Sequence, residues 1–294
     1  MIPATSQIGI GITTKDRWDD LESTLKILQA EGLDSLETIV IDDGSVTALP
    51  SPFKGQFPWV TFMRFESSQG LITQRNRLAQ LLSTPLILQL DDDSFPVAGS
   101  LAAAASWLME RPGVCALALR MINRDAPLPA DFATKPPFAV RSFVGCCVLV
   151  KREPFLALGG YEERLEFNLE ELEFCTKALQ QGQETYAYPA VVIRHRFAPV
   201  GRNVGRRTRQ YARNYVLICL WYYPFPISHL RAIRYGPVGI VKNAQFREYW
   251  KDALIGWLQG MLCYFSWPQE KKRLSLKQFH DWENLHSVGD GSAV

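Results

Sequence analysis

The sequence predicts an α/β fold in which a mainly parallel, Rossmann-like sheet is flanked by helices. Apolar strand-like runs alternate with helical segments through the first half of the chain. Three of those strands are followed directly by polar clusters, at residues 13–17, 42–45 and 91–94. Ligands of such sheets bind at the carboxyl ends of the strands, so these clusters predict one site. Beyond about Pro224 the strand signals stop and a C-terminal helical extension is expected.

The expected elements follow from apolar spacing and from turn residues. In the first half the strands are 8–13, 37–41, 60–65 and 86–90, and the helices are 18–31, 71–82 and 99–110. After Leu119 we expect a loop at 123–137, a strand at 143–150, a helix at about 169–181 and short strands at 184–188 and 191–196. We therefore expect a domain at 1–224, with halves of about 1–120 and 121–224, and a helical extension at 225–294.

Composition excludes several classes of protein. The net charge of +2 argues against strong nonspecific binding of nucleic acid. The N-terminus lacks the features of a signal peptide, and no apolar run is long enough to span a membrane. The six cysteines show neither CxxC pairing nor zinc-like spacing, and Cys146 and Cys147 are expected to be small buried hydrophobes rather than a disulfide or ligand pair. These features predict a reducing, cytoplasmic setting.

The run from Leu86 to Pro96 is the most informative stretch, because a short apolar strand ends there in three aspartates. Unpaired carboxylates beside an apolar core are costly. In an extended chain residues i and i+2 point the same way, so Asp91 and Asp93 are expected to converge while Asp92 faces elsewhere. Such oxygen ligands suit Mg²⁺ or Mn²⁺, which can hold a diphosphate. The alternative is an acidic turn or helix cap before Pro96.

An ordered set of segments resembles the family 2 glycosyltransferases. The segments are ITTKDR, ETIVIDDGS, QGLITQRNRLAQLLSTPLILQLDDDS, GGYEERLEFNLEELEFCTKALQQG and RHRF; they stand in the family's order, and the resemblance extends over roughly residues 8–214. The resemblance implies the GT-A fold, with a nucleotide-sugar half at about 1–120 and an acceptor half at about 121–224. Residues 224–294 resemble only the variable helical tails of such enzymes.

The resemblance also implies a nucleotide-sugar donor, with UDP as the family's commonest nucleotide, and a divalent cation, Mn²⁺ or Mg²⁺. The residues implied for nucleotide contact are Thr13, Arg17, Asp42, Asp43, Arg75, Asp91 and Asp92, with Asp42 favoured over Asp43. Asp93 is implied as the direct metal ligand, with Asp91 on the ribose or on the metal through water, and His195 completing the site. The alternatives are a β-turn at DDGS, a structural ion pair for Arg75 and a structural role for His195.

The helix LEELEFCTKAL carries the implied catalytic base. The family usually has Glu-Asp where this chain has Glu170-Glu171. We choose Glu171, because it shares an apparently half-buried face with Phe174 and Ala178, whereas Glu170, Glu173 and Lys177 share a face expected to be solvated. The alternative is an acidic first turn stabilised by the helix dipole. Arg202 and Arg206 are assigned to the donor diphosphate or an anionic acceptor, with a solvated basic face as the alternative.

One departure from the family lies before the Arg-Asn helix, where the chain has Ser68-Gln69-Gly70 instead of Asn-x-Gly. The glycine turn is kept, but a contact made by the asparagine is not.

The function expected is an inverting, metal-dependent hexosyltransferase of glycan, polysaccharide or glycoconjugate biosynthesis. It would move a sugar to a hydroxyl of a saccharide, lipid-linked or other acceptor. The rivals are a non-catalytic nucleotide-sugar-binding module or scaffold of the same fold and a sugar-1-phosphate nucleotidyltransferase, although ITTKDRWDD is not a glycine-rich phosphate loop.

The C-terminal segment at 246–265 has apolar residues at helical spacing: Trp250, Leu254, Trp257, Leu258 and Met261. This face could rest on the inner surface of a membrane beside basic residues, or it could pack on the catalytic domain or in a homodimer. Packing is the favoured interpretation.

Overall fold

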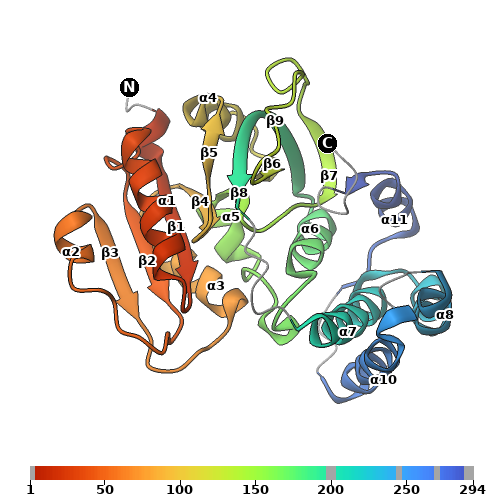
Figure 1. Cartoon of the computed structure of the whole chain (residues 1–294). Helices are drawn as coiled ribbons and strands as arrows, with labels where there is room; N and C mark the ends of the chain where they lie inside the picture. The colour runs from red at the N-terminus through yellow and green to blue at the C-terminus, as the bar shows by residue number, and fades with distance from the viewer. Residues whose placement is uncertain (1–3, 197–202, 243–246, 268–271, 288–294) are drawn as a thin grey trace. The chain divides into compact units, whose positions relative to one another are not determined.

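The chain divides into two compact units in this computed structural model, which describes residues 4–196, 203–242, 247–267 and 272–287 (Figure 1). Unit 1 comprises residues 1–161, 182–198 and 286–294, and unit 2 comprises residues 162–181 and 199–285. The boundary expected at residue 224 therefore falls inside unit 2. The helix Val204–Tyr222 packs there against the C-terminal helices.

Unit 1 is built on one mixed sheet. Its strands are β1 (Ile8–Thr14), β2 (Thr38–Asp42), β3 (Val60–Arg64), β4 (Leu86–Asp91), β5 (Ser94–Ala98), β6 (Val114–Asn123), β7 (Phe138–Ser142), β8 (Cys147–Lys151), β9 (Glu184–His195) and β10 (His286–Ser287). Its helices are α1 (Trp18–Ala30), α2 (Phe53–Gln56), α3 (Leu71–Leu81), α4 (Leu101–Met109) and α5 (Arg152–Ala157), after a 3-10 turn at Ala4–Gln7. The strand order is β10-β7-β9-β6-β8-β4-β1-β2-β3, with β5 paired to β9.

The first four strands form the parallel part of the sheet, in the order β4-β1-β2-β3. From β1 the sheet extends through β2 to β3, and β4 then pairs with the opposite edge of β1. The point where the strand order reverses therefore lies between β1 and β4, which is where α/β sheets bind ligands.

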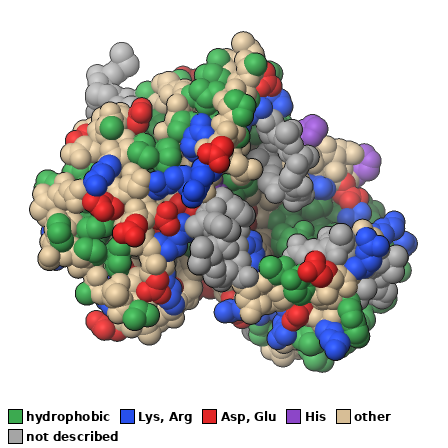
Figure 2. All heavy atoms as spheres, viewed as in Figure 1, with side chains coloured by type: hydrophobic (Ala, Val, Ile, Leu, Met, Phe, Trp, Pro, Cys, Tyr) green, Lys and Arg blue, Asp and Glu red, His purple; other side chains and the backbone are tan. Residues whose placement is uncertain are grey.

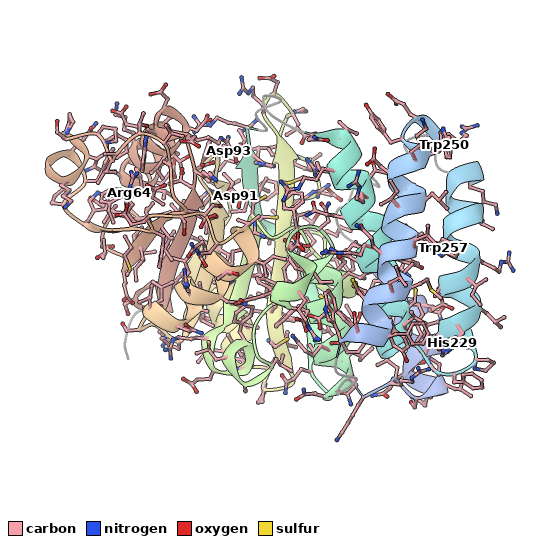
Figure 3. The ribbon with its side chains drawn as sticks, turned by 90° about the horizontal axis from the view of Figure 1, so that it is seen from below. Arg64, Asp91, Asp93, His229, Trp250 and Trp257 are labelled. Carbon is pink, nitrogen blue, oxygen red and sulfur yellow. The ribbon has the colours of Figure 1, made fainter. Side chains whose placement is uncertain are left out.

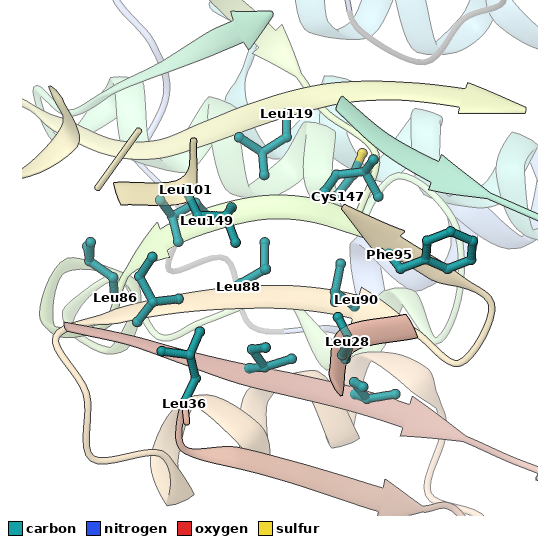
Figure 4. Close-up of a cluster of buried hydrophobic side chains, with 14 of the residues drawn as sticks. Leu28, Leu36, Leu86, Leu88, Leu90, Phe95, Leu101, Leu119, Cys147 and Leu149 are labelled. Carbon is teal, nitrogen blue, oxygen red and sulfur yellow. The ribbon is translucent and has the colours of Figure 1, made fainter. Parts of the chain in front are cut away.

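Alternate residues of β1 explain how helices cover both faces of the sheet. Ile8, Ile10 and Ile12 are fully buried in one core cluster that also holds leucines of α1 and α4. Figure 4 shows part of this cluster, with Leu88 and Leu90 of β4 pointing into it. On the opposite face, a Cβ at Gly11 would lie 3.2 Å from the Leu78 side chain. The glycine lets α3 pack closely against the strand, so that the predicted helix–sheet–helix layering is confirmed.

The structure corrects several predicted boundaries. The run 143–150, expected to be one strand, turns at Val144, whose carbonyl accepts from the Cys147 amide (3.0 Å), and β8 begins only there. The two short strands expected at 184–188 and 191–196 form a single strand, β9, whose register against β6 shifts beside Pro189. Proline has no amide hydrogen to donate, so a local irregularity replaces the predicted break. Strands β5, β6, β7 and β10, the short helices α2 and α5 and the helix Val204–Tyr222 were not predicted.

Unit 2 is helical throughout the residues described. It contains a 3-10 turn at Glu163–Leu165, α6 (Glu170–Gln180), α7 (Val204–Tyr222), α8 (Ile227–Lys242), α10 (Trp250–Ser266) and α11 (Leu276–Glu283). A Cβ at Gly256 of α10 would lie 2.0 Å from the Arg209 carbonyl oxygen, so glycine is required for the close approach of α10 to α7. Trp257, labelled in Figure 3, turns toward α8 and donates to the Ala232 carbonyl (2.7 Å).

The opposite side of α10 is apolar and exposed. Four of its residues, which we call the α10 apolar stripe, are 40% to 78% exposed: Ile255, Leu258, Leu262 and Phe265. Figure 2 shows hydrophobic side chains beside Lys and Arg on this part of the surface. Within the described ranges no helix combines the length and the apolar character that crossing a bilayer requires.

Candidate functional site

Strand register brings the three polar clusters of the sequence together at one edge of the sheet. Thr14 at the end of β1 pairs with Asp42 at the end of β2, and Thr13 pairs with Asp91 at the end of β4. The chain turns immediately after Asp91 and re-enters the sheet as β5. Asp91, Asp92 and Asp93 are therefore presented at the point where the strand order reverses, and Asp91 and Asp93 are labelled in Figure 3.

Each aspartate of this triplet has a cationic partner. Asp91 Oδ1 lies 2.8 Å from Nη2 of the Arg75 guanidinium. The Arg17 guanidinium bridges the other two, at 2.8 Å from Asp92 Oδ1 and 2.6 Å from Asp93 Oδ2. The buried Thr14 hydroxyl, which the sequence analysis did not single out, donates to Asp92 (2.8 Å). These contacts compensate most of the negative charge of the three adjacent carboxylates next to the core.

His195 enters the site from β9. The pairing of β5 with β9 places His195 opposite Ser94, and its Nε2 lies 3.0 Å from Asp93 Oδ1. Burial by itself would lower the pKa of His195, but the bonds to Asp93 and Cys146 raise it to about 10. Burial would likewise raise the pKa of Asp93, but His195 and Arg17 hold it well below its ordinary value. Asp93 is accordingly an anion with both oxygens engaged.

The pKa of Asp92 is shifted in the opposite direction to that of Asp93. Its side chain is almost completely buried, and burial raises its pKa to about 7 even though Arg17 and Thr14 favour the charged form. Asp91 and Asp93 both approach His195, whereas Asp92 accepts from Thr14; Asp92 does not turn away from Asp93, however, because both bind the same Arg17 guanidinium.

Asp42 and Asp43 have separate environments. Asp43 accepts four hydrogen bonds, from the Ser68 hydroxyl (2.6 Å), the Gln69 amide (2.7 Å), the Gly70 amide (3.0 Å) and the Gln74 side chain (2.6 Å). The Asp43 carboxylate thus fixes the turn that precedes α3. Ser68-Gln69-Gly70, which stands where the family usually has Asn-x-Gly, supplies three of these donors. Asp42 accepts from the Ser45 amide (2.9 Å) and hydroxyl (2.5 Å), and Arg64 lies 3.2 Å from its second oxygen.

A cavity of about 420 Å³ borders Asp42. Its walls come from β2, β3, the start of α1 and the segment around α2, and include Trp18, Val40, Leu49, Lys54, Phe62 and Arg64. This volume lies in the range of small-molecule sites.

Arg75 and Asn76 of α3 contact different parts of unit 1. Arg75 makes the ion pair with Asp91, as the structural alternative predicted. Asn76 donates to the Tyr161 carbonyl (2.9 Å) and accepts from the Tyr161 amide (2.8 Å), which fixes the glycine turn after α5.

Cys146 was not predicted to lie in the site. Its thiol, a carboxylate oxygen of Asp91 and a ring nitrogen of His195 all lie within 4.8 Å of one another. Sequence reasoning treated this cysteine as a small hydrophobe because no ligand-like spacing surrounds it. Its neighbours come from strands that are distant in the chain, so only the sheet topology reveals the cluster.

The candidate base and the arginines belong to unit 2. Glu171 is partly exposed in the first turn of α6, whereas Glu170, Glu173 and Lys177 are buried. The face expected to be solvated is therefore buried, and that prediction was wrong. The reason is that Glu173 accepts a hydrogen bond from the Tyr222 hydroxyl of α7 and lies 3.3 Å from Lys177 Nζ.

Arg202 lies outside the described residues, and Arg206 is exposed in the first turn of α7. Two of the neighbouring arginines have structural partners. Arg209 bonds to Asp252 (2.6 Å), and Arg213 bonds to Glu166 (2.8 Å) and to the carbonyls of Arg164 and Leu165.

Residues 10–155 match the family model described as glycosyl transferase family 2. A search of curated protein sequences found no match.

Several solved structures share the fold. GalNAc-T7, solved with UDP, GalNAc and Mn²⁺, is 19% identical with a TM-score of 0.63; the match covers 87% of this chain but only 56% of that one. The mannosyltransferase PcManGT from Pyrobaculum calidifontis, in complex with GDP-Man and Mn²⁺, is 18% identical with a TM-score of 0.56, covering 94% and 78%. S. aureus TarS 1-349 with UDP-GlcNAc is 14% identical with a TM-score of 0.59, covering 86% and 81%. At these identities the likeness establishes the fold and not the substrate.

Proposed function

We propose that this chain, which residues 10–155 identify as a member of glycosyltransferase family 2, transfers a sugar from a nucleotide-diphosphate donor to an acceptor hydroxyl with inversion. The observation that carries the proposal is the meeting of Thr13, Asp42 and Asp91 at the reversal point of the sheet, next to the cluster around His195. Solved proteins of the same fold bind UDP, UDP-GlcNAc or GDP-Man. The donor nucleotide is accordingly proposed to be UDP, with GDP as the alternative to be tested.

We place the nucleoside at Thr13 and Asp42. Asp43 is the weaker candidate, because its oxygens already accept four hydrogen bonds from the protein. Asp42 has fewer donors, and the 420 Å³ cavity beside it gives room for a ligand.

A divalent cation fits the residues next to this position. Carboxylate and imidazole donors suit Mn²⁺ and Mg²⁺, and two proteins of the same fold were solved with Mn²⁺. Asp91 and His195 would hold the ion. Asp93 was predicted to be the direct ligand; with its oxygens on His195 and Arg17, we propose instead that it orients His195. When bound, such an ion neutralises the charge that develops on the departing diphosphate.

Glu171 is proposed as the base that removes the proton of the acceptor hydroxyl. It is the partly exposed glutamate of the first turn of α6, whereas Glu170 and Glu173 are buried. A side chain that meets an acceptor must be reachable by it. The exposed Arg206 stays a proposed contact for an anionic acceptor or the donor diphosphate.

The test measures both transfer and donor binding in Glu171→Gln. Loss of at least about 100-fold in turnover, with donor affinity unchanged, is expected for removal of a general base. The exposed Glu163 supplies the matched control, Glu163→Gln, which should keep full activity. Donor binding without any transfer or hydrolysis in the wild type, unchanged in Glu171→Gln, would instead favour the non-catalytic module.

We also propose that the α10 apolar stripe rests on an anionic lipid surface, which is where a lipid-linked acceptor would be found. In the described residues from 203 to 267 nine Lys and Arg accompany two acidic residues, so the charge favours such a surface over a neutral protein partner. Cosedimentation with vesicles containing phosphatidylglycerol tests this. A concentration-dependent dimer without vesicle binding would show instead that a second copy of the chain covers the stripe.

A further inference from the structure

We propose that Cys146 is a third protein ligand of the cation, so that Asp91, Cys146 and His195 form a site that accepts a thiophilic divalent ion such as Zn²⁺ or Co²⁺. This inference rests on the cation site of the proposed function, and it names the class of ion that the site can take. A thiol among carboxylate and imidazole donors shifts preference from hard ions toward softer ones.

Strand pairing in the sheet places Cys146 beside Asp91. Strand β8 runs antiparallel to β4 with Cys147 opposite Leu90, so Cys146 lies beside Asp91, the next residue of β4. The Ser94 hydroxyl ties the two together, because it accepts from the Asp91 amide (2.8 Å) and donates to the Cys146 carbonyl (3.0 Å). These bonds fix the backbone positions of both residues, and the donor atoms are thereby preorganised.

His195 reaches the same point from another direction. It pairs with Ser94 across β5 and β9, and with Asn123 across β6 and β9. Its Nε2 is engaged with Asp93 and the ring also bonds to Cys146, so the imidazole lies between the carboxylate of Asp93 and the thiol of the cluster. A carboxylate behind a ligating histidine is the usual way in which proteins orient the ring and strengthen its binding of metal.

The spacing of the three donor atoms suits an ion at their centre. The centre of an equilateral triangle with 4.8 Å sides lies about 2.8 Å from each corner, and 4.8 Å is the upper limit of the separations. Zinc bonds are about 2.0–2.3 Å long, so an inward movement of at most about 0.5–0.8 Å at each side chain completes the contacts.

Access and charge are consistent with this arrangement. Cys146 and His195 are 2% and 9% exposed, whereas the Asp91 side chain is 25% exposed and forms the open side through which an ion enters. Arg75 occupies one oxygen of Asp91, which leaves the second oxygen for the ion. On binding, the sulfur–hydrogen bond of Cys146 is replaced by a sulfur–metal bond, and the protonated His195 ring gives up the proton of its ligating nitrogen; both protons pass to the buffer.

The experiment is Co²⁺ titration of the whole chain, without nucleotide, followed by absorption spectroscopy. Wild type is expected to show a near-ultraviolet band from thiolate-to-cobalt charge transfer. Cys146→Ser should lose this band and bind Co²⁺ at least about 10-fold more weakly. Cys115→Ser is the matched control and should keep the band, because this buried thiol lies outside the cluster and donates to the Glu184 carbonyl (3.4 Å).

A band that survives in Cys146→Ser, or Co²⁺ binding to wild type without a band, would overturn the role of Cys146 and leave the proposed function intact. Wild type that binds neither Co²⁺ nor Mn²⁺ would overturn the cation site as a whole. X-ray absorption of the zinc-loaded wild type needs no variant: one sulfur neighbour is expected, and none would contradict the proposal.

Discussion

Arg17→Ala should lower the free energy of unfolding by about 2–3 kcal/mol. Removing one partner of a buried ion pair costs about 3–5 kcal/mol, because the other charge is left buried and uncompensated. Asp92 and Asp93, the partners of Arg17, have side chains only 4% and 1% exposed. We reduce the expected loss because Arg17 is itself 33% exposed, so water screens its charge, and because Asp93 keeps His195 and Asp92 keeps Thr14.

The assay is thermal unfolding followed by circular dichroism at low ionic strength, and the loss corresponds to a fall of about 4–10 °C in Tm. Lys15→Ala is the matched control, because Lys15 is exposed in the same loop and its removal changes the net charge equally. If the two variants unfold within about 0.5 kcal/mol of each other, a typical surface effect, Arg17 does not compensate the buried aspartates and the reasoning is refuted.

Three further outcomes follow from the contacts. Tyr222→Phe should lower stability by about 1–3 kcal/mol, because the buried Glu173 loses its hydroxyl donor; an unchanged urea midpoint would contradict this. Burial would raise the pKa of Asp43, but the hydrogen bonds from Gln74, Ser68, Gln69 and Gly70 lower this pKa. The Asp43 carboxylate therefore stabilises the fold at pH values above its unfolded pKa. That stabilisation is lost as the pH falls through the pKa of the folded state. Asp43→Asn should therefore destabilise at pH 7, and the difference in unfolding free energy from wild type, measured with urea, should narrow as the pH falls below the ordinary aspartate pKa of 3.8; a constant difference would argue against it. Leu262→Asp, in the exposed α10 apolar stripe, should weaken binding to anionic vesicles at least about 10-fold without changing Tm, whereas unchanged binding would remove the stripe from the contact.

Local patterns were sufficient for the parallel part of the sheet. The alternation of apolar runs and helical spacing identified β1, β2, β3, β4 and the helices between them. The polar residues that follow β1, β2 and β4 could be assigned to one site because the carboxyl ends of parallel strands lie at one edge.

Contacts between distant segments were beyond such reasoning. Cys146 looks like any small apolar residue until β8 pairs with β4 and sets it beside Asp91. The polar face of α6 has the spacing of a solvated surface, but Tyr222, 49 residues beyond Glu173, covers it and supplies a donor. The role of Asp43 depends on a turn 25 to 27 residues away. In each case the deciding partner is set by tertiary structure, which spacing along the chain does not encode.

The most direct test of the donor site is calorimetric titration with UDP, GDP, dTDP and CMP, each with and without Mn²⁺, on wild type and on Asp91→Asn. We expect one nucleoside diphosphate to bind in the presence of Mn²⁺, and its affinity to fall at least about 10-fold when the ion is removed or Asp91 is changed. Binding of none of these nucleotides, or binding that is indifferent to both Mn²⁺ and Asp91, would contradict the assignment of the donor site.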